Sequence, residues 1–141
     1  MATIKSFTSL EQSKVLAEIL PLESADMMYE YLSDSENYLD KPTVIPIKDY
    51  LFADDLPCWS LTSLLSVLPN EVSTADRFEC KYQIHIRKYD GGDNTTFYQI
   101  AYGNNRGLSG SWHDMINTGE KENLIDCCVQ MIIKLHELNL L

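Results

Sequence analysis

The chain has 141 residues, of which 45% are hydrophobic, and its formal net charge is −10 at pH 7. This length fits a single domain, 1–141, which can bury about two thirds of its unfolded surface without a metal or a disulfide. No apolar run approaches the roughly 20 residues of a membrane helix, and the start, MATIKSFTSLEQ, lacks the apolar segment of a signal peptide. We therefore expect a soluble protein of a reducing cytosol.

The negative charge is concentrated in residues 23–55. This segment carries nine acidic residues and two lysines, a net charge of −7, whereas the rest of the chain shares −3. Such a field repels nucleic-acid phosphates and anionic lipids, so we expect no direct binding to nucleic acid or to a membrane. Two interpretations stay open. The segment is a solvated loop that keeps the protein soluble, or it imitates DNA or docks on a partner protein with a basic surface, through Asp34, Glu36 and Asp40.

The first two expected helices are bounded by capping residues and prolines. Thr8 and Glu11 make a capping-box pattern ahead of a helix over 9–20, and a proline follows it. Ser60 is the expected N-cap of a helix over 60–68, in which leucines recur at helical spacing until another proline.

A β-hairpin is expected over 80–102. Apolar and polar residues alternate in ECKYQIHIRKY and again in TTFYQIAY, and DGGDN between them supplies residues that tolerate positive φ. The alternation places Lys81, His85 and Arg87 on one face, as a small basic patch that is either a solvated surface or an anion site. The segment TVIPI is a candidate edge strand of the same sheet, because its proline cannot donate to a ladder.

The connection 103–119 contains four of the six glycines together with Arg106, Trp112, His113 and Asp114. A connection of this length without periodicity is typical of a functional or a mobile loop. Its sequence GNNRGLSGS lacks the G-K-[ST] ending of a phosphate-binding loop and the G-x-S-x-G of a hydrolase nucleophile. We therefore expect these four residues to contact a ligand or a partner, and we expect no catalytic residue and no cofactor.

The last expected helix, 123–138, starts at an asparagine N-cap and contains two adjacent cysteines. On a helical wheel Cys128 points into the apolar arc, whereas Cys127 lies about 100° away at its border, so the two thiols cannot bind one ion as neighbours. The spacing of the four cysteines follows no zinc pattern. We predict packing thiols and no metal, and we interpret His136 as a core or rim residue rather than a ligand.

Three blocks carry a resemblance: LPLESADMMY at 20–29, LPCWSLTSLLSVLP at 56–69, and LIDCCVQMIIKLHELNLL at 124–141. They resemble a group of small uncharacterised proteins encoded by phages and mobile elements of gut bacteria. The resemblance implies a bacterial cytosol and a phage or prophage setting. It implies no activity, cofactor or catalytic residue.

The expected fold class is α+β, a small antiparallel sheet with the 80–102 hairpin at its centre and the three helices covering one face. An up-and-down helical bundle is the alternative. The expected function is that of a non-enzymatic, acidic interaction or accessory protein of a phage or mobile element. The alternative function is binding of a small anionic ligand by the 103–119 loop and the face that holds Lys81, His85 and Arg87.

Overall fold

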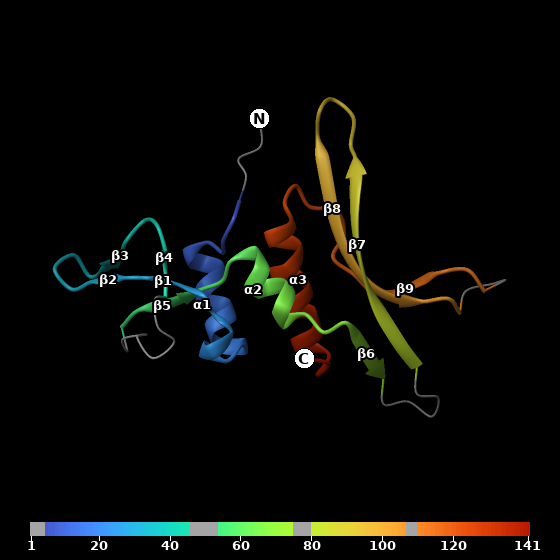
Figure 1. Ribbon diagram of the computed structural model, residues 1–141, viewed down its shortest axis with the longest axis horizontal. Coiled ribbons are helices and arrows are strands. Elements are labelled where there is room, and N and C mark those ends of the chain that lie inside the picture. Colours follow the sequence, from blue (N-terminus) through green and yellow to red (C-terminus); the bar gives the residue numbers. More distant parts are fainter. Residues whose placement is uncertain (1–4, 46–53, 75–79, 107–109) are drawn as a thin grey trace. The chain divides into compact units, whose positions relative to one another are not determined.

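The computed structural model describes residues 5–45, 54–74, 80–106 and 110–141 (Figure 1). The chain divides into two compact units, one formed by Lys5–Val67 and the other containing Leu68–Leu141. Each unit is described by itself, and the single domain expected from the length stays a prediction.

The Lys5–Val67 unit is built on a three-stranded antiparallel sheet. Its elements are α1 (Leu10–Ile19), the 3-10 turn η1 (Leu22–Ser24), β1 (Met27–Tyr29), β2 (Tyr31–Leu32), β3 (Asn37–Tyr38), β4 (Thr43–Val44), β5 (Leu56–Cys58) and α2 (Leu61–Val67). β1 lies between β4 and β5, and β2 and β3 form a separate hairpin. α1 packs against β5 over a core made by Tyr29, Leu56 and Cys58.

The start of α1 differs from the expected capping box by one residue. Ser9 is the N-cap: its Oγ accepts the N–H of Gln12 at 3.2 Å, and the Gln12 side chain accepts the N–H of Ser9 at 3.1 Å. Thr8 is fully buried instead, and its Oγ1 accepts the N–H of Trp59 at 3.1 Å. The expected pair of Thr8 and Glu11 is therefore wrong, because the Thr8 hydroxyl is used by a strand-end residue far along the chain.

The start of α2 is held by the carboxylate of Asp26, which lies between η1 and β1. Asp26 accepts the backbone N–H of Ser60 at 2.9 Å and also its hydroxyl. Ser60 Oγ in turn accepts the N–H of Ser63 at 3.3 Å, as expected of the N-cap. Burial alone would raise the pKa of Asp26, but the hydrogen bonds from Ser60 and Ser63 together outweigh it and lower that pKa.

The unit that contains Leu68–Leu141 is a four-stranded antiparallel sheet with one long helix. Its elements are β6 (Glu71–Thr74), β7 (Cys80–Asp90), β8 (Thr96–Asn104), β9 (His113–Asn117) and α3 (Leu124–Glu137), and the strand order is β6-β7-β8-β9. The long β7–β8 hairpin is evident in Figure 1. α3 packs against β8, where Ile100 and Tyr102 are fully buried. Asn123 is the N-cap of α3, as expected, and accepts the N–H of Asp126 at 2.8 Å.

The expected arrangement, a small sheet covered by three helices, is wrong, and so is the alternative of a helical bundle. The described residues form nine strands in three sheets, so the fold is dominated by sheet. α1 and α2 belong to one unit and α3 to the other. The helices themselves lie within the expected ranges 9–20, 60–68 and 123–138, and the hairpin spans the expected 80–102.

Several strands lie where the sequence indicates none or have partners other than those expected. Within the acidic stretch 23–55, β1 pairs with β5 and with β4, so the TVIPI strand borders this sheet and not the hairpin; its last two residues lie outside the described ones. Within the loop 103–119, β9 pairs with β8. These strands have two to five residues each and partners distant in sequence, so local periodicity does not indicate them.

Both cysteines of α3 are fully buried, and all four cysteines are free thiols. The expected border position of Cys127 is wrong, because β8 lies against it: its thiol donates to the carbonyl of Tyr98 at 3.2 Å. His136, expected in the core or at its rim, is exposed in the last turn of α3.

Candidate functional site

The four-stranded sheet has an apolar side that packs on α3 and an opposite side that carries polar and aromatic residues. Strand alternation places Ile100 and Tyr102 on the α3 side. On the opposite side Arg87 of β7 pairs in register with Gln99 of β8, and Asp114 of β9 pairs with Gly103 of β8. Three strands therefore contribute to one surface.

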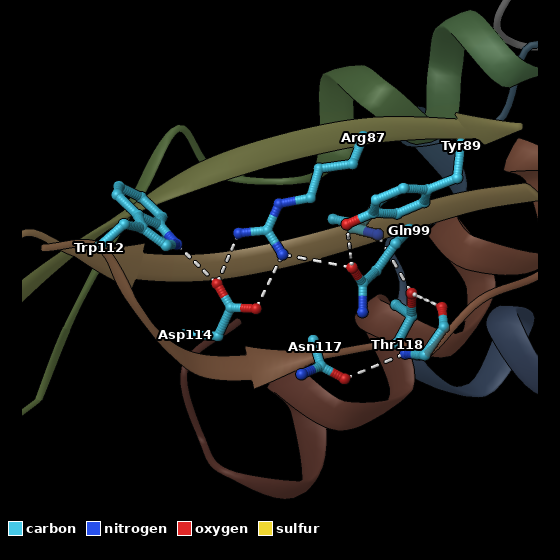
Figure 2. Close-up of polar contacts among 9 residues, drawn as sticks. Arg87, Tyr89, Gln99, Trp112, Asp114, Asn117 and Thr118 are labelled. Atoms are coloured by element: carbon cyan, nitrogen blue, oxygen red, sulfur yellow. Dashed lines mark hydrogen bonds and ion pairs between the residues drawn. The ribbon is translucent and has the colours of Figure 1, made fainter. Parts of the chain in front are cut away.

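A hydrogen-bonded network joins these strands (Figure 2). Arg87 holds Asp114 in a bidentate ion pair, with Nη1 at 2.8 Å from Oδ2 and Nη2 at 2.7 Å from Oδ1. The indole Nε1 of Trp112 donates to Asp114 Oδ1 at 2.6 Å, so this carboxylate lies between the indole and the guanidinium. Gln99 Oε1 accepts from Arg87 Nη1 at 3.2 Å and from the Tyr89 hydroxyl at 3.0 Å. Every member of the network thus restrains another.

The ion pair holds both groups in their charged forms. The Arg87 guanidinium lowers the pKa of Asp114, and burial opposes this to a smaller extent. Asp114 in turn raises the pKa of Arg87. The side chains of Arg87 and Asp114 are 25% and 22% exposed, so solvent screens their interaction less than it screens a pair on an open surface.

A stacked pair of rings continues the surface. The rings of His85 and Trp112 are nearly parallel, at an interplanar angle of 10°, with their centroids 3.6 Å apart. Gly103 leaves the room that Trp112 needs to stack on His85. A Cβ at Gly103 would lie 2.8 Å from the indole of Trp112 and would also overlap the carbonyl of His113. We call the six residues that form this surface the polar face: His85, Arg87, Tyr89, Gln99, Trp112 and Asp114.

The structure brings together four of the seven residues expected to contact a ligand or partner: His85, Arg87, Trp112 and Asp114. The other three lie elsewhere. Lys81 approaches Glu71 of β6 at 3.9 Å and is about 20 Å along β7 from Arg87. Arg106 donates to the sulfur of Cys80 at 3.0 Å. His113 is exposed, and alternation directs it to the side of β9 opposite its two neighbours.

Sequence reasoning missed Tyr89, Gln99 and Gly103. Tyr89 follows Arg87 at a spacing of two on the same strand, so alternation could have placed it on the polar face. Gln99 could have been found only from the register of the hairpin, which pairs it with Arg87. Gly103 has no local signal, because its function depends on the close approach of Trp112.

The acidic candidates occupy a separate region. Asp34 and Glu36 are exposed in the turn between β2 and β3, and Asp40 is exposed just after β3. Glu36 has a φ of 55°, which fits its position at the end of a tight hairpin turn. All three carboxylates are therefore available to an approaching partner.

The polar face is poorly suited to an anionic ligand. A phosphate or carboxylate binds arginine best through two parallel hydrogen bonds, and Asp114 already accepts both from Arg87. A bound anion would have to displace Asp114, which would leave a partly buried carboxylate without its partner.

The described residues contain no group of three or more His, Cys, Asp or Glu side chains that could hold a metal ion. Burial raises the pKa of the Cys128 thiol to about 12 and also raises the pKa values of Cys58 and Cys127, so these thiols are protonated and poorly nucleophilic near neutral pH. Their position favours packing over chemistry.

Comparison of the chain with family models, with curated proteins and with solved structures finds no match. No helix in the described part of the chain has the length and apolar composition that a bilayer crossing requires. The geometry of the polar face and the distribution of charge are the features of the chain that bear on its function.

Proposed function

We propose that this chain is a non-enzymatic interaction protein that contacts a protein partner through the polar face. The observation that carries the proposal is the restrained, solvent-accessible group of Arg87, Tyr89 and Trp112. Tyrosine, tryptophan and arginine are the residue types that contribute most of the binding energy in protein interfaces.

The network supports this function in a second way. Ordering a flexible side chain on association costs about 0.5–1.5 kcal/mol, and side chains already held by one another avoid part of that cost. Arg87 and Trp112 share Asp114 as an acceptor, and Tyr89 shares Gln99 with Arg87. The polar face is thus preorganised, which favours contact with a complementary surface over closure around a small ligand.

The charge supports a partner with a basic surface. The net charge of −10 and the exposed Asp34, Glu36 and Asp40 favour encounter with a positive protein. With the resemblance of the three sequence blocks, this extends the proposal to an accessory protein of a phage or mobile element that acts in the host cytoplasm.

Affinity purification from a bacterial cytosolic extract, at low and high ionic strength, tests the proposal. We expect a protein partner to be retained by the wild type, to be lost by Tyr89→Ala and His85→Ala, and to be kept by Lys88→Ala. Lys88 is the matched control, because it is exposed on the same strand but alternates to the other side. Recovery of no partner at any ionic strength would reject the interaction function. Equal retention of a partner by all variants would show that the polar face is not the surface that binds it.

Binding of a small anion is the second candidate, and a thermal-shift screen separates it from the first. A ligand at 100 times its dissociation constant stabilises its protein by about 2.7 kcal/mol. Because Asp114 occupies the bidentate side of Arg87, we expect phosphate, nucleotides and dicarboxylates to leave the melting temperature unchanged. A saturable increase that Arg87→Met abolishes would favour the ligand-binding function.

A further inference from the structure

β9 is the last strand in the order β6-β7-β8-β9, so within the described residues its outer side pairs with no other strand. Thr118, just after β9, donates its backbone N–H inward to Ile100 of β8 at 3.0 Å. Successive residues of an antiparallel strand direct their peptide groups to opposite sides, so the N–H and C=O of Asn117 point away from β8. Their position offers a donor and an acceptor to an additional strand.

A pocket of about 420 Å³ lies beside this edge. It is lined by three residues of β9 and three at the end of α3, namely Met115, Ile116, Asn117, Lys134, Glu137 and Leu138. Its apolar lining includes Leu138, whose side chain is 54% exposed. An unpaired strand edge with a partly apolar pocket at its side is the combination used when a protein binds an extended peptide by strand addition, because the backbone supplies affinity and the pocket supplies selectivity.

We propose that β9 and this pocket bind an extended, cationic segment of a partner protein, which adds to the sheet as a further strand next to β9. This inference rests on the proposed interaction function and specifies how the partner is held. Side chains of the added strand alternate, so every second one enters the pocket while the others border the polar face through Asp114 and Trp112. The β-bulge between Tyr102 and Gly103 twists this edge, so the site accommodates a short segment.

The net charge selects a cationic peptide over a second copy of this chain. Each copy carries a net charge of −10, so two copies repel one another, whereas a lysine- or arginine-rich segment is attracted. β9 itself contains neither lysine nor proline, which are the residues that most often prevent pairing at an exposed edge. The pocket lining carries one charge of each sign, Lys134 and Glu137, so the side chains that enter the pocket are the uncharged ones of the segment.

The probe is a soluble synthetic peptide of about eight residues in which lysine and leucine alternate, a length sufficient to form one strand. Its binding to the full chain, labelled with nitrogen-15, is followed by amide chemical shifts. We expect saturable binding with shifts confined to β9, its flanks and the end of α3. A peptide with glutamate in place of lysine, and one N-methylated at alternate residues so that it cannot donate hydrogen bonds to β9, should each bind at least about tenfold more weakly.

Two variants locate the pocket. Leu138→Asp should weaken binding of the lysine–leucine peptide by about tenfold or more, because it places a charge against the apolar side chain that enters. Leu141→Asp is the matched control, since Leu141 is a second exposed leucine close by in sequence that does not line the pocket, and it should leave the affinity unchanged. Absence of saturable binding, equal affinity of the N-methylated peptide, or shifts outside β9, its flanks and the end of α3 would overturn the proposal.

Failure of strand addition at β9 can be distinguished from failure of the interaction function itself. If a partner purified from extract binds Leu138→Asp as it binds the wild type but is lost by His85→Ala, strand addition is wrong and the polar face still contacts the partner. If the peptide binds at β9 while no partner is recovered from extract, the edge binds as proposed and the interaction function fails.

Discussion

Arg87 and Asp114 connect two strands that are not neighbours. Their bidentate ion pair joins β7 to β9 across β8, with contacts of 2.7 and 2.8 Å (Figure 2). The intervening strand places Ala101 and Gly103 on the same side, and these small residues leave room for the guanidinium and for the indole of Trp112. The ion pair therefore stabilises the edge strand that both proposed binding surfaces use.

Replacement of Asp114 by Asn should remove about 1 kcal/mol of stability at pH 7, since this is the size expected of a well-aligned, partly exposed pair. The pKa of Asp114 is lowered in the folded state, so its contribution is present above the unfolded pKa of about 3.9 and is lost as pH falls through the folded pKa. The difference in unfolding free energy between wild type and Asp114→Asn should thus narrow below about pH 4, as measured by urea denaturation. Asp93→Asn, in the exposed hairpin turn, is the control and should change little; a difference for Asp114→Asn that is constant from pH 7 to pH 3 would contradict the ion-pair assignment.

Gly103→Ala should lower the unfolding free energy by about 1–3 kcal/mol, the range for an added methyl group that forces its neighbours to move. The new Cβ would meet the indole of Trp112 and the carbonyl of His113, so Trp112 must leave its stack on His85. Tryptophan fluorescence should therefore change in the native state. Gly92→Ala is the matched control, because Gly92 has a positive φ but open space around it: it should be strained without altering the fluorescence.

The two cysteines of α3 should behave alike, because both are fully buried. Cys127→Ala and Cys128→Ala should each lower the unfolding free energy by about 1–2 kcal/mol, by loss of a buried group and the cavity that it leaves. Under native conditions a thiol reagent followed by mass spectrometry should modify Cys80, which is partly exposed, before the three buried thiols. Equal modification of all four, or a stability loss on chelator treatment, would contradict the assignment of buried, metal-free thiols.

The acidic docking role can be tested by the combined substitution Asp34→Asn, Glu36→Gln and Asp40→Asn. Exposed carboxylates contribute little to stability, so the melting temperature should stay nearly unchanged. Association with a basic partner should slow, and its dependence on salt should weaken, because charges at a distance act mainly on the association rate and are screened within about 8 Å at physiological ionic strength. If the wild type and the triple variant associate with the partner at the same rate at two salt concentrations, only the solubilising function is left for these residues.

Part of the polar face could be predicted from the sequence. The residues that could be predicted follow from a local pattern, and the others depend on strand pairing. His85 and Arg87 follow from alternation along β7, which is a local pattern. Trp112 and Asp114 were recognised by residue type in a glycine-rich segment, but their place beside Arg87 depends on the pairing of β9 with β8. Arg106 is grouped with them because it lies in the same segment, but its side chain contacts Cys80. Lys81 is grouped with Arg87 by alternation along β7, but it lies near Glu71, about 20 Å along the strand from Arg87.

The sequence by itself determined the elements whose signals are local: three helices with their caps and apolar stripes, and a hairpin marked by alternation and a turn. The tertiary structure alone decided the short strands β1, β5 and β9, the pairing of β4 with β1, the division of the helices between two units, and the network around Asp114. The physical reason is that a helix and a hairpin are stabilised by contacts between near neighbours in the chain. The strands β1, β5 and β9 have three to five residues and pair with partners distant in sequence, and no local pattern specifies those partners.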